Sequence, residues 1–474
     1  TDSKTKIVVT GVGANLKTLD TNVDTVDASA ATGAITIAAA DRPDTAMTIT
    51  TSTGDDSIAM DHKNDVIDAG TGTDTLVVTG NGVLGGFAVD LTSTTDQLTQ
   101  YGGVANAAVQ KGFENVNLGA VTGTFGSDVT GSDGANTITV NDGNSNVDAG
   151  KGNDTISGGE GTDVLLGGKG DDTFIIRTVT DFFSTTGGTS TGEDTITGGT
   201  GTDVIALDAS AGALTIASGD DWTDGKISGI SKITANGAQA NAISITTNAA
   251  FSADTSITEI DLSADTGTAG SNVINVSANT GSGAWTLTGS GHIDTITGDG
   301  GADIIDGGGG ADIITPGGGA DIVTPGGGSD IVIFGSTGDS DTIIEVSSAD
   351  DLNVDALINN RVGDAFVAWS GTGAATDGNI LNLTSASALA NATAVVAKFE
   401  IIGGGSSTKM RVGDNESVIL VVQDDDVANG TDYDAQVWNV ESDATDITAT
   451  LVATIDNAPV GGENASVLVI GNFV

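Results

Sequence analysis

The sequence predicts an all-β protein, a parallel β-solenoid followed by a small mixed C-terminal domain. Three observations support this fold class: a nine-residue repeat in four blocks, short alternating apolar stretches between the blocks, and an unusual composition. The 474 residues include 71 glycines and carry a formal net charge of −49. A chain so acidic and so rich in glycine lies close to the disordered class unless something neutralises it.

The composition also excludes several classes of function. The negative charge argues against binding nucleic acid or an anionic membrane through charge. The chain has no cysteine, which removes disulfides, thiol catalysis and cysteine-ligated metal centres. No apolar run approaches the roughly 18 residues of a membrane-spanning helix. The sequence starts at Thr1 without a signal-peptide pattern, so we expect a mature or trimmed form, with the native N-terminus left open.

Residues 1–50 are expected to form an N-terminal β segment. The alternating stretches AITIAAA, from Ala34, and AMTITT, from Ala46, are typical of short strands. The segment also holds three of the few basic residues, Lys4, Lys6 and Lys17. We interpret these lysines as ordinary solubilising side chains or as groups that face phosphate.

A nine-residue period occurs in four separate blocks between position 51 and position 345. Its ideal form is G-G-x-G-x-D-x-U-x, where U is a large apolar residue. The main block, 289–333, consists of five units in tandem, and a further unit with Asp341 follows after a slip of two residues. The sixth positions of the five tandem units are Asp294, Asp303, Asp312, Asp321 and Asp330.

Three further blocks carry the same pattern. Block 131–175 starts degenerate, with Asn136 and Ser145 at its sixth positions, and then becomes ideal. The acids at the sixth positions of blocks 51–77, 131–175 and 189–206 are Asp56, Asp65, Asp74, Asp154, Asp163, Asp172, Asp194 and Asp203.

The spacing predicts where the acids lie. Six residues make a turn, in which glycine supplies φ > 0, and three make a short strand with the apolar residue pointing inward. Two units complete an eighteen-residue coil, so the spacing stacks Asp294 under Asp312 and Asp330, and Asp154 under Asp172. Carboxylates about 4.8 Å apart repel one another strongly unless a cation lies between them.

Calcium suits such an all-oxygen site because it accepts six or more ligands in flexible geometry, whereas magnesium demands a tighter octahedron. About a dozen Ca²⁺ would offset about half of the net charge. The ligands would be the stacked carboxylates together with turn carbonyls, namely those of Gly152, Gly161, Gly170, Gly301, Gly310, Gly319 and Gly328.

These blocks resemble the calcium-binding RTX repeats of secreted bacterial proteins. The resemblance implies a right-handed parallel β-roll, multiple Ca²⁺ and export by type I secretion. Two simpler interpretations are a flexible Gly/Asp-rich linker, which the inward apolar residue argues against, and a calcium-bound scaffold without a regulatory role.

The segments between the blocks are interpreted as further rungs. On this view 51–206 is a solenoid that contains three blocks, 207–288 consists of solenoid-like rungs with looser turns, and 289–345 is the main repeat region. The stretch FENVNL at Phe113 has a similar character. The alternative for these segments is one or more β-sandwich inserts.

Residues 346–474 are expected to form a capping and secretion-signal domain. A helix is predicted from Thr384, and strands from Ser417 and Tyr433. The run 424–426, followed by Asp432, is placed in the turn between these strands, either as a solvated turn or as another cation site. The apolar tail VLVIGNFV resembles the uncleaved signal of exported RTX proteins.

We find no catalytic set in the sequence. The only histidines, His62 and His292, occupy repeat turns, and no His-Glu-x-x-His motif is present. The segment 188–192 matches G-x-S-x-G, but it runs into a repeat turn instead of a helix. The prediction is therefore that the protein is not an enzyme.

Three functions fit these features. The first is a surface-layer protein that folds with calcium and self-assembles into a two-dimensional lattice on the bacterial cell surface, anchored to lipopolysaccharide or another surface glycan. The second is an RTX adhesin or biofilm-matrix protein, although no period of about 100 residues indicates repeated Ig-like modules. The third is an RTX-linked secreted enzyme with its catalytic part within positions 1–130.

Overall fold

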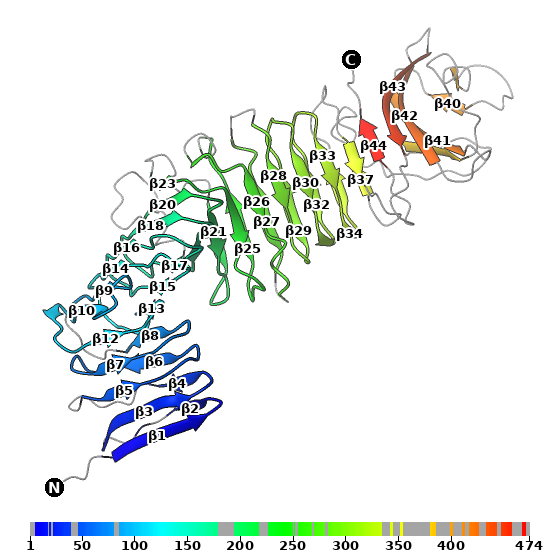
Figure 1. Cartoon of the computed structure of the whole chain (residues 1–474). Helices are drawn as coiled ribbons and strands as arrows, with labels where there is room; N and C mark the ends of the chain where they lie inside the picture. The colour runs from blue at the N-terminus through cyan, green and yellow to red at the C-terminus, as the bar shows by residue number, and fades with distance from the viewer. Residues whose placement is uncertain are drawn as a thin grey trace. The chain divides into compact units, whose positions relative to one another are not determined.

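The computed structural model describes the chain in two units, residues 1–236 with 250–257, and residues 237–249 with 258–474 (Figure 1). Within residues 5–333 the described parts exclude 18, 20–21, 39–45, 80–84, 179–193, 218–225, 250, 252–254, 268–269 and 280–282. Beyond residue 333 the description is confined to the backbone of β-strands, whose bounds are given below.

The first unit is built from ladders of parallel strands. One ladder contains β1 (Thr5–Gly11), β3 (Val23–Ala31), β5 (Thr48–Thr50), β7 (Val66–Asp68) and β12 (Gln110–Lys111). A second begins with β2 (Ala14–Leu16), β4 (Ile35–Ile37), β6 (Ser57–Met60), β8 (Thr75–Val78) and β13 (Asn115–Asn117). It continues with β15 (Thr137–Thr139), β17 (Thr155–Ser157), β19 (Thr173–Ile176), β21 (Val204–Leu207) and β24 (Lys232–Ala235).

A third ladder of this unit contains β9 (Ala88–Asp90), β14 (Asp128–Thr130), β16 (Asn146–Asp148), β18 (Val164–Lys169), β20 (Thr195–Thr200) and β23 (Ile227–Ser228). Its first strand also pairs with an antiparallel excursion, β10 (Leu98–Tyr101) and β11 (Val104–Ala105). The remaining strand of the unit is β22 (Leu214–Ile216). The strands of 79–130 are therefore rungs of the solenoid, with one short hairpin added.

The second unit has the same construction. One ladder contains β25 (Ile243–Thr246), β27 (Asn272–Asn275), β29 (Asp294–Thr297), β32 (Ile313–Thr315), β35 (Ile331–Ile333) and β37 (Asp351–Asn353). The other contains β26 (Glu259–Asp261), β28 (Thr286–Thr288), β30 (Ile304–Asp306), β33 (Ile322–Thr324) and β36 (Thr342–Ile344). The turn strands β31 (Gly309–Gly310) and β34 (Gly327–Gly328) pair as well.

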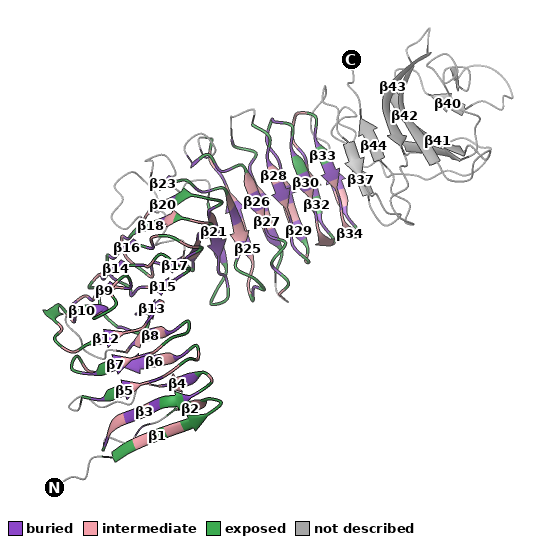
Figure 2. Ribbon diagram, viewed as in Figure 1, coloured by how far each residue is buried: buried purple, intermediate pink, exposed green. Residues whose placement is uncertain are grey.

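The pairing register confirms the predicted eighteen-residue coil. Thr155 pairs with Thr173 in the first unit, and Ile304 with Ile322 in the second. Eighth-position side chains point inward, as predicted: Ile156, Phe174 and Val323 are fully buried. Figure 2 shows that burial alternates with exposure along the strands, which is the period of two expected for strands that cover a core on one face.

The C-terminal strands only partly match the prediction. Strands are found at β41 (Ser417–Asp425) and β42 (Tyr433–Ser442), as expected, and they pair antiparallel with each other. The prediction that Asp424 lies in a turn is wrong, because Asp424 pairs with Asp434 within this hairpin. The other strands here are β38 (Ile380–Thr384), β39 (Phe399–Ile401), β40 (Met410–Val412), β43 (Ile447–Asp456) and β44 (Val467–Ile470). The helix predicted after Thr384 lies outside the described residues.

Candidate calcium-binding turns

The sixth-position acids form ladders that run from rung to rung. In each ladder the Oδ1 atom of one aspartate accepts the backbone N–H of the residue at the equivalent position one rung earlier. Thus the N–H of Asp154 donates to Asp172, and the N–H of Asp294 donates to Asp312, at 2.9 and 2.8 Å. The same bond reaches Asp56, Asp65, Asp74, Asp154, Asp163, Asp194, Asp203, Asp303, Asp321 and Asp330.

The ladder continues across the segment between the second and third short blocks. The N–H of Asp163 donates to Asp194 and that of Asp172 donates to Asp203, although each pair is 31 residues apart instead of 18. Blocks 131–175 and 189–206 are therefore one continuous stack of turns.

The second carboxylate oxygen of several ladder acids has no protein partner. Among the described residues, the Oδ2 atoms of one group are buried and accept no hydrogen bond. This group consists of Asp56, Asp74, Asp154, Asp172, Asp203 and Asp312. A buried charged oxygen without a partner costs several kcal/mol, so such atoms need a cation or a proton.

The pKa values of the acids also indicate that their oxygens need a cation or a proton. Burial, followed by repulsion from neighbouring carboxylates, raises the pKa of Asp74, Asp154 and Asp312 to about 7. For Asp154 the repelling neighbour is Asp172, whose own pKa burial also raises. Such shifts describe the chain without a metal ion, and a divalent cation beside these oxygens would favour their charged form.

Glycine makes room next to the acids. In the turn of Asp312, a methyl group at Gly307 would lie 2.9 Å from the unpartnered Oδ2 atom. Glycine also supplies the left-handed backbone of the turn, with φ between +114° and +149° at Gly152, Gly161, Gly170, Gly310, Gly319 and Gly328. The predicted ligand Gly301 differs, because its φ is not positive.

Side chains alone do not complete a metal site. Within the described part of the chain, no three His, Cys, Asp or Glu side chains lie together in a way that could hold an ion. Backbone carbonyls of the turns must therefore supply further ligands. A set of carboxylate and carbonyl oxygens is the donor set that calcium prefers, and the residues present fit this ion.

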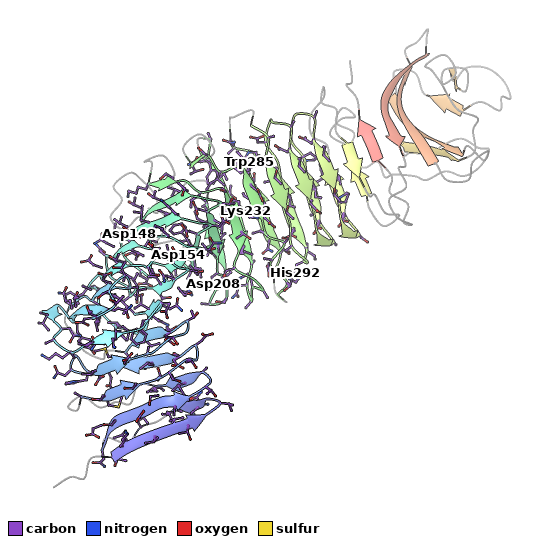
Figure 3. All side chains as sticks on the ribbon, in the orientation of Figure 1. Asp148, Asp154, Asp208, Lys232, Trp285 and His292 are labelled. Carbon is purple, nitrogen blue, oxygen red and sulfur yellow. The ribbon has the colours of Figure 1, made fainter. Side chains whose placement is uncertain are left out.

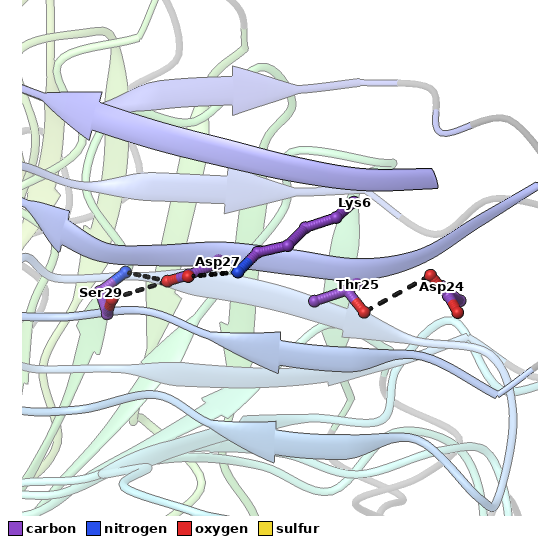
Figure 4. A network of polar contacts seen from close by, with 5 residues as sticks. All are labelled: Lys6, Asp24, Thr25, Asp27 and Ser29. Carbon is purple, nitrogen blue, oxygen red and sulfur yellow. Dashed lines mark hydrogen bonds and ion pairs between the residues drawn. The ribbon is translucent and has the colours of Figure 1, made fainter. Parts of the chain in front are cut away.

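Acids outside the ladders are satisfied in a different way. Figure 4 shows Asp27 on β3, which pairs with the Lys6 ammonium at 2.8 Å and accepts the N–H and hydroxyl of Ser29. Lys6 and Ser29 lower the pKa of this exposed carboxyl to about 2. One of the three N-terminal lysines thus faces a carboxylate of this chain.

Some predicted ligands have protein donors on both oxygens. The Oδ2 atom of Asp303 accepts the N–H of Asp299 at 3.0 Å, and that of Asp65 accepts the N–H of His62 at 3.2 Å. The Oδ2 atom of Asp294 accepts the N–H of Ser290 at 2.6 Å. The last predicted acid, Asp341, lies outside the described residues.

Sequence reasoning missed two ladder acids. The Oε2 atom of Glu114 accepts the N–H of Asp74 at 2.7 Å and so takes the place of the next aspartate. Asp265 accepts the N–H of Gln239 at 2.9 Å. Glu114 could have been found, because it lies within FENVNL and directly precedes β13 as Asp74 precedes β8. Asp265 has no repeat signal around it.

Both histidines take part in hydrogen bonds of their turns. The Nδ1 atom of His62 accepts the N–H of Asn64, and the N–H of His292 donates to Ser290. The G-x-S-x-G segment 188–192 lies outside the described residues.

Stacked acid turns on a parallel β-solenoid define a calcium-binding repeat protein. The model of the RTX calcium-binding nonapeptide repeat matches the chain in four copies, at residues 130–165, 139–174, 189–211 and 288–323. The chain therefore carries RTX calcium-binding repeats, with multiple Ca²⁺ as its cofactors. Proteins with these repeats are typically secreted to the extracellular space. A comparison with curated proteins found no match.

The matched segments cover about a fifth of the chain and include most of the predicted ligands. The block with Asp56, Asp65 and Asp74 lies outside them, yet it forms the same ladder. In the described part of the chain, no helix is both long enough and apolar enough to cross a bilayer.

Proposed function

We propose that this protein is a structural surface-layer protein and not an enzyme. It would fold with calcium outside the cell and assemble into a two-dimensional lattice on the bacterial surface. The observation that carries the proposal is the distribution of the repeats. Rungs with and without the repeat signature alternate along residues 5–333, so the calcium turns are part of the body of the protein.

Calcium would act twice in such a lattice. Within a monomer it would neutralise the buried ladder acids and hold successive rungs together. Between monomers it would screen or bridge acidic surfaces, because copies of a chain with a charge of −49 repel one another. An anchor to lipopolysaccharide or another surface glycan belongs to the same proposal.

Electron microscopy of the purified full chain tests the proposal. Negative-stain images should show ordered sheets at millimolar calcium and dispersed particles in chelator. Monomers at every calcium concentration would contradict the lattice. Dispersed protein that binds a glycan array would favour an adhesin, and turnover of alginate or ester substrates would favour an RTX-linked enzyme.

A further inference from the structure

The first two turns of the main repeat block are built differently from the turn that follows them. At the second position of the repeat they carry Ser290 and Asp299, whereas the next turn carries Gly308. Gly308 has φ +87°, and among the described residues other than glycine only Ser256 has positive φ. The backbone N–H at this position therefore points in a different direction in the first two turns.

In the first turn this N–H points at the acid. Ser290 donates its N–H to the Oδ2 atom of Asp294 at 2.6 Å, and its hydroxyl lies 3.0 Å from the same oxygen. The Ser290 hydroxyl also accepts the N–H of His292 at 3.1 Å, which holds the side chain in place. Protein donors thus occupy the oxygen that a cation would otherwise need to reach.

In the second turn, protein donors likewise occupy both carboxylate oxygens of the acid. Asp303 accepts the N–H of Trp285 on Oδ1 at 2.8 Å and the N–H of Asp299 on Oδ2 at 3.0 Å. Asp299 is itself buried, and its carboxylate accepts donors from Gly301 at 2.7 Å, Asn279 at 3.1 Å and the indole of Trp285 at 3.2 Å. Figure 3 labels His292, which lies in the first of these turns, and Trp285, which lies one rung before the second.

The third turn lacks these donors. Asp312 accepts the N–H of Asp294 on Oδ1, but its buried Oδ2 atom has no hydrogen-bond partner. A serine at the second position does not by itself provide a donor to the Oδ2 atom of the acid. In the turn of Asp56, Ser52 donates its hydroxyl to the Ala31 carbonyl, and the Oδ2 atom of Asp56 stays unpartnered. The hydrogen bond to Oδ2 is therefore the feature that separates the two kinds of turn.

We infer that calcium binding in the main block begins at the turn of Asp312, and that the turns of Asp294 and Asp303 hold no calcium. The backbone N–H groups of Ser290 and Asp299 replace the ion there, since they donate to the second carboxylate oxygen of Asp294 and Asp303. These two turns then form without a metal ion, and the calcium-dependent rungs of the main block stack on them.

Counting calcium ions on the intact full-length protein by native mass spectrometry tests this assignment. Asp312→Asn should lose at least one Ca²⁺ per chain. The matched change Asp303→Asn removes the same charge one half-coil away and should keep the native number of ions, even if the fold is weakened. A loss of ions in Asp303→Asn equal to that in Asp312→Asn would overturn the inference, as would a native count in both variants.

A gain of binding provides the second arm, which does not depend on a destabilised variant. The double change Ser290→Gly and His292→Gly restores the glycine pattern of the turn at Gly308 and Gly310. With the N–H at position 290 free to turn away, the Oδ2 atom of Asp294 becomes available, and the variant should bind at least one more Ca²⁺ than the native chain. An unchanged count would show that Ser290 does not exclude the ion.

Discussion

The conformation of each calcium-binding turn depends on close contacts of individual residues. The glycine at the fourth position of the repeat is an example. Gly319 has φ +122°, and a methyl group placed on it would overlap the carbonyl oxygen of Gly301 in the previous rung. Gly300, in the same block, has no atom within 4 Å of the equivalent point and does not have positive φ. The two glycines therefore differ in function, in line with their places in the repeat: Gly319 is at the fourth position, where the pattern has glycine, and Gly300 is at the third, where any residue is allowed.

Gly319→Ala should destabilise the calcium-bound fold by about 1–3 kcal/mol, because alanine is strained at positive φ and would also push against the neighbouring rung. Thermal unfolding at saturating calcium measures the change. Gly300→Ala is the control and should stay within about 0.5 kcal/mol of the native protein. Equal losses in both variants would mean that the close approach of the rungs does not limit the turn.

At this scale the sequence predicted which acids stack, but not how their oxygens are used. The eighteen-residue period placed Asp294 under Asp312, as found. The difference between these two acids comes from the direction of one backbone N–H, at Ser290 in one turn and at Gly308 in the other. The repeat pattern treats both turns alike, because it records residue types and not the donors that face each oxygen.

The rung is the element of this fold, and its register tolerates insertions outside the strands. Asp172 and Asp203 bond as ladder neighbours although they are 31 residues apart, so thirteen residues exceed the usual 18. Pairing continues on both sides, between β18 and β20 and between β19 and β21. Since the entropic cost of a longer loop grows slowly with its length, such an insertion has little effect on stability.

Deleting residues 177–189 tests this view. The deletion joins Ile176 to Ser190, keeps the whole of β19 and shortens both spacings to the usual eighteen. We expect the same calcium-dependent strand signal and a midpoint of thermal unfolding within about 5 °C of the native value. Among the described residues the deletion removes the ion pair of Arg177 with Asp208 and leaves the strands in place.

The control deletes thirteen residues inside the repeat, 146–158, and should abolish the cooperative transition. A deletion there removes two strands and moves inward-facing side chains away from the core. If both deletions unfold the protein, the register model is wrong.

Rungs without the repeat motif were harder to predict from sequence. The strand that contains Val116 continues the ladder of β8, although the paired residues Thr75 and Asn115 are widely separated in the sequence. FENVNL indicated a strand there, but no fixed period links it to its neighbour. The hairpin of β10 and β11 had no prediction, because its alternation of residue types is short and its turn lacks the repeat pattern.

At the scale of the whole molecule, the negative charge determines how folding depends on calcium and on pH. With a formal net charge of −49 and buried acids in its stacked turns, the fold without metal must either protonate these acids or separate them. Asp74, Asp154 and Asp312 have their pKa raised to about 7 in the folded chain without metal. The calcium-free fold therefore binds more protons than the unfolded chain does over the range between the ordinary aspartate pKa and about 7.

The expected result in excess chelator is a loss of strand signal near pH 8 and a partial recovery near pH 5. The contribution of these groups to the stability of the calcium-free fold is full below the ordinary aspartate pKa. It is lost as the pH rises through about 7. Circular dichroism with and without chelator across this range measures both effects. A strand signal that is unchanged by chelator at pH 8 would show that calcium is not needed for folding.

In the acid ladder, each backbone N–H donates to the carboxylate of the next rung, so the first and last rungs of a stack leave different groups without a partner. Removing the last rung leaves an N–H such as that of Asp154 without its acceptor, Asp172. At the acid ladder itself, removing the first rung leaves a carboxylate oxygen without its donor, and water or an ion can hydrate this oxygen at lower cost. In force spectroscopy, unfolding the repeats from the N-terminal end should therefore need a different force from unfolding them from the C-terminal end.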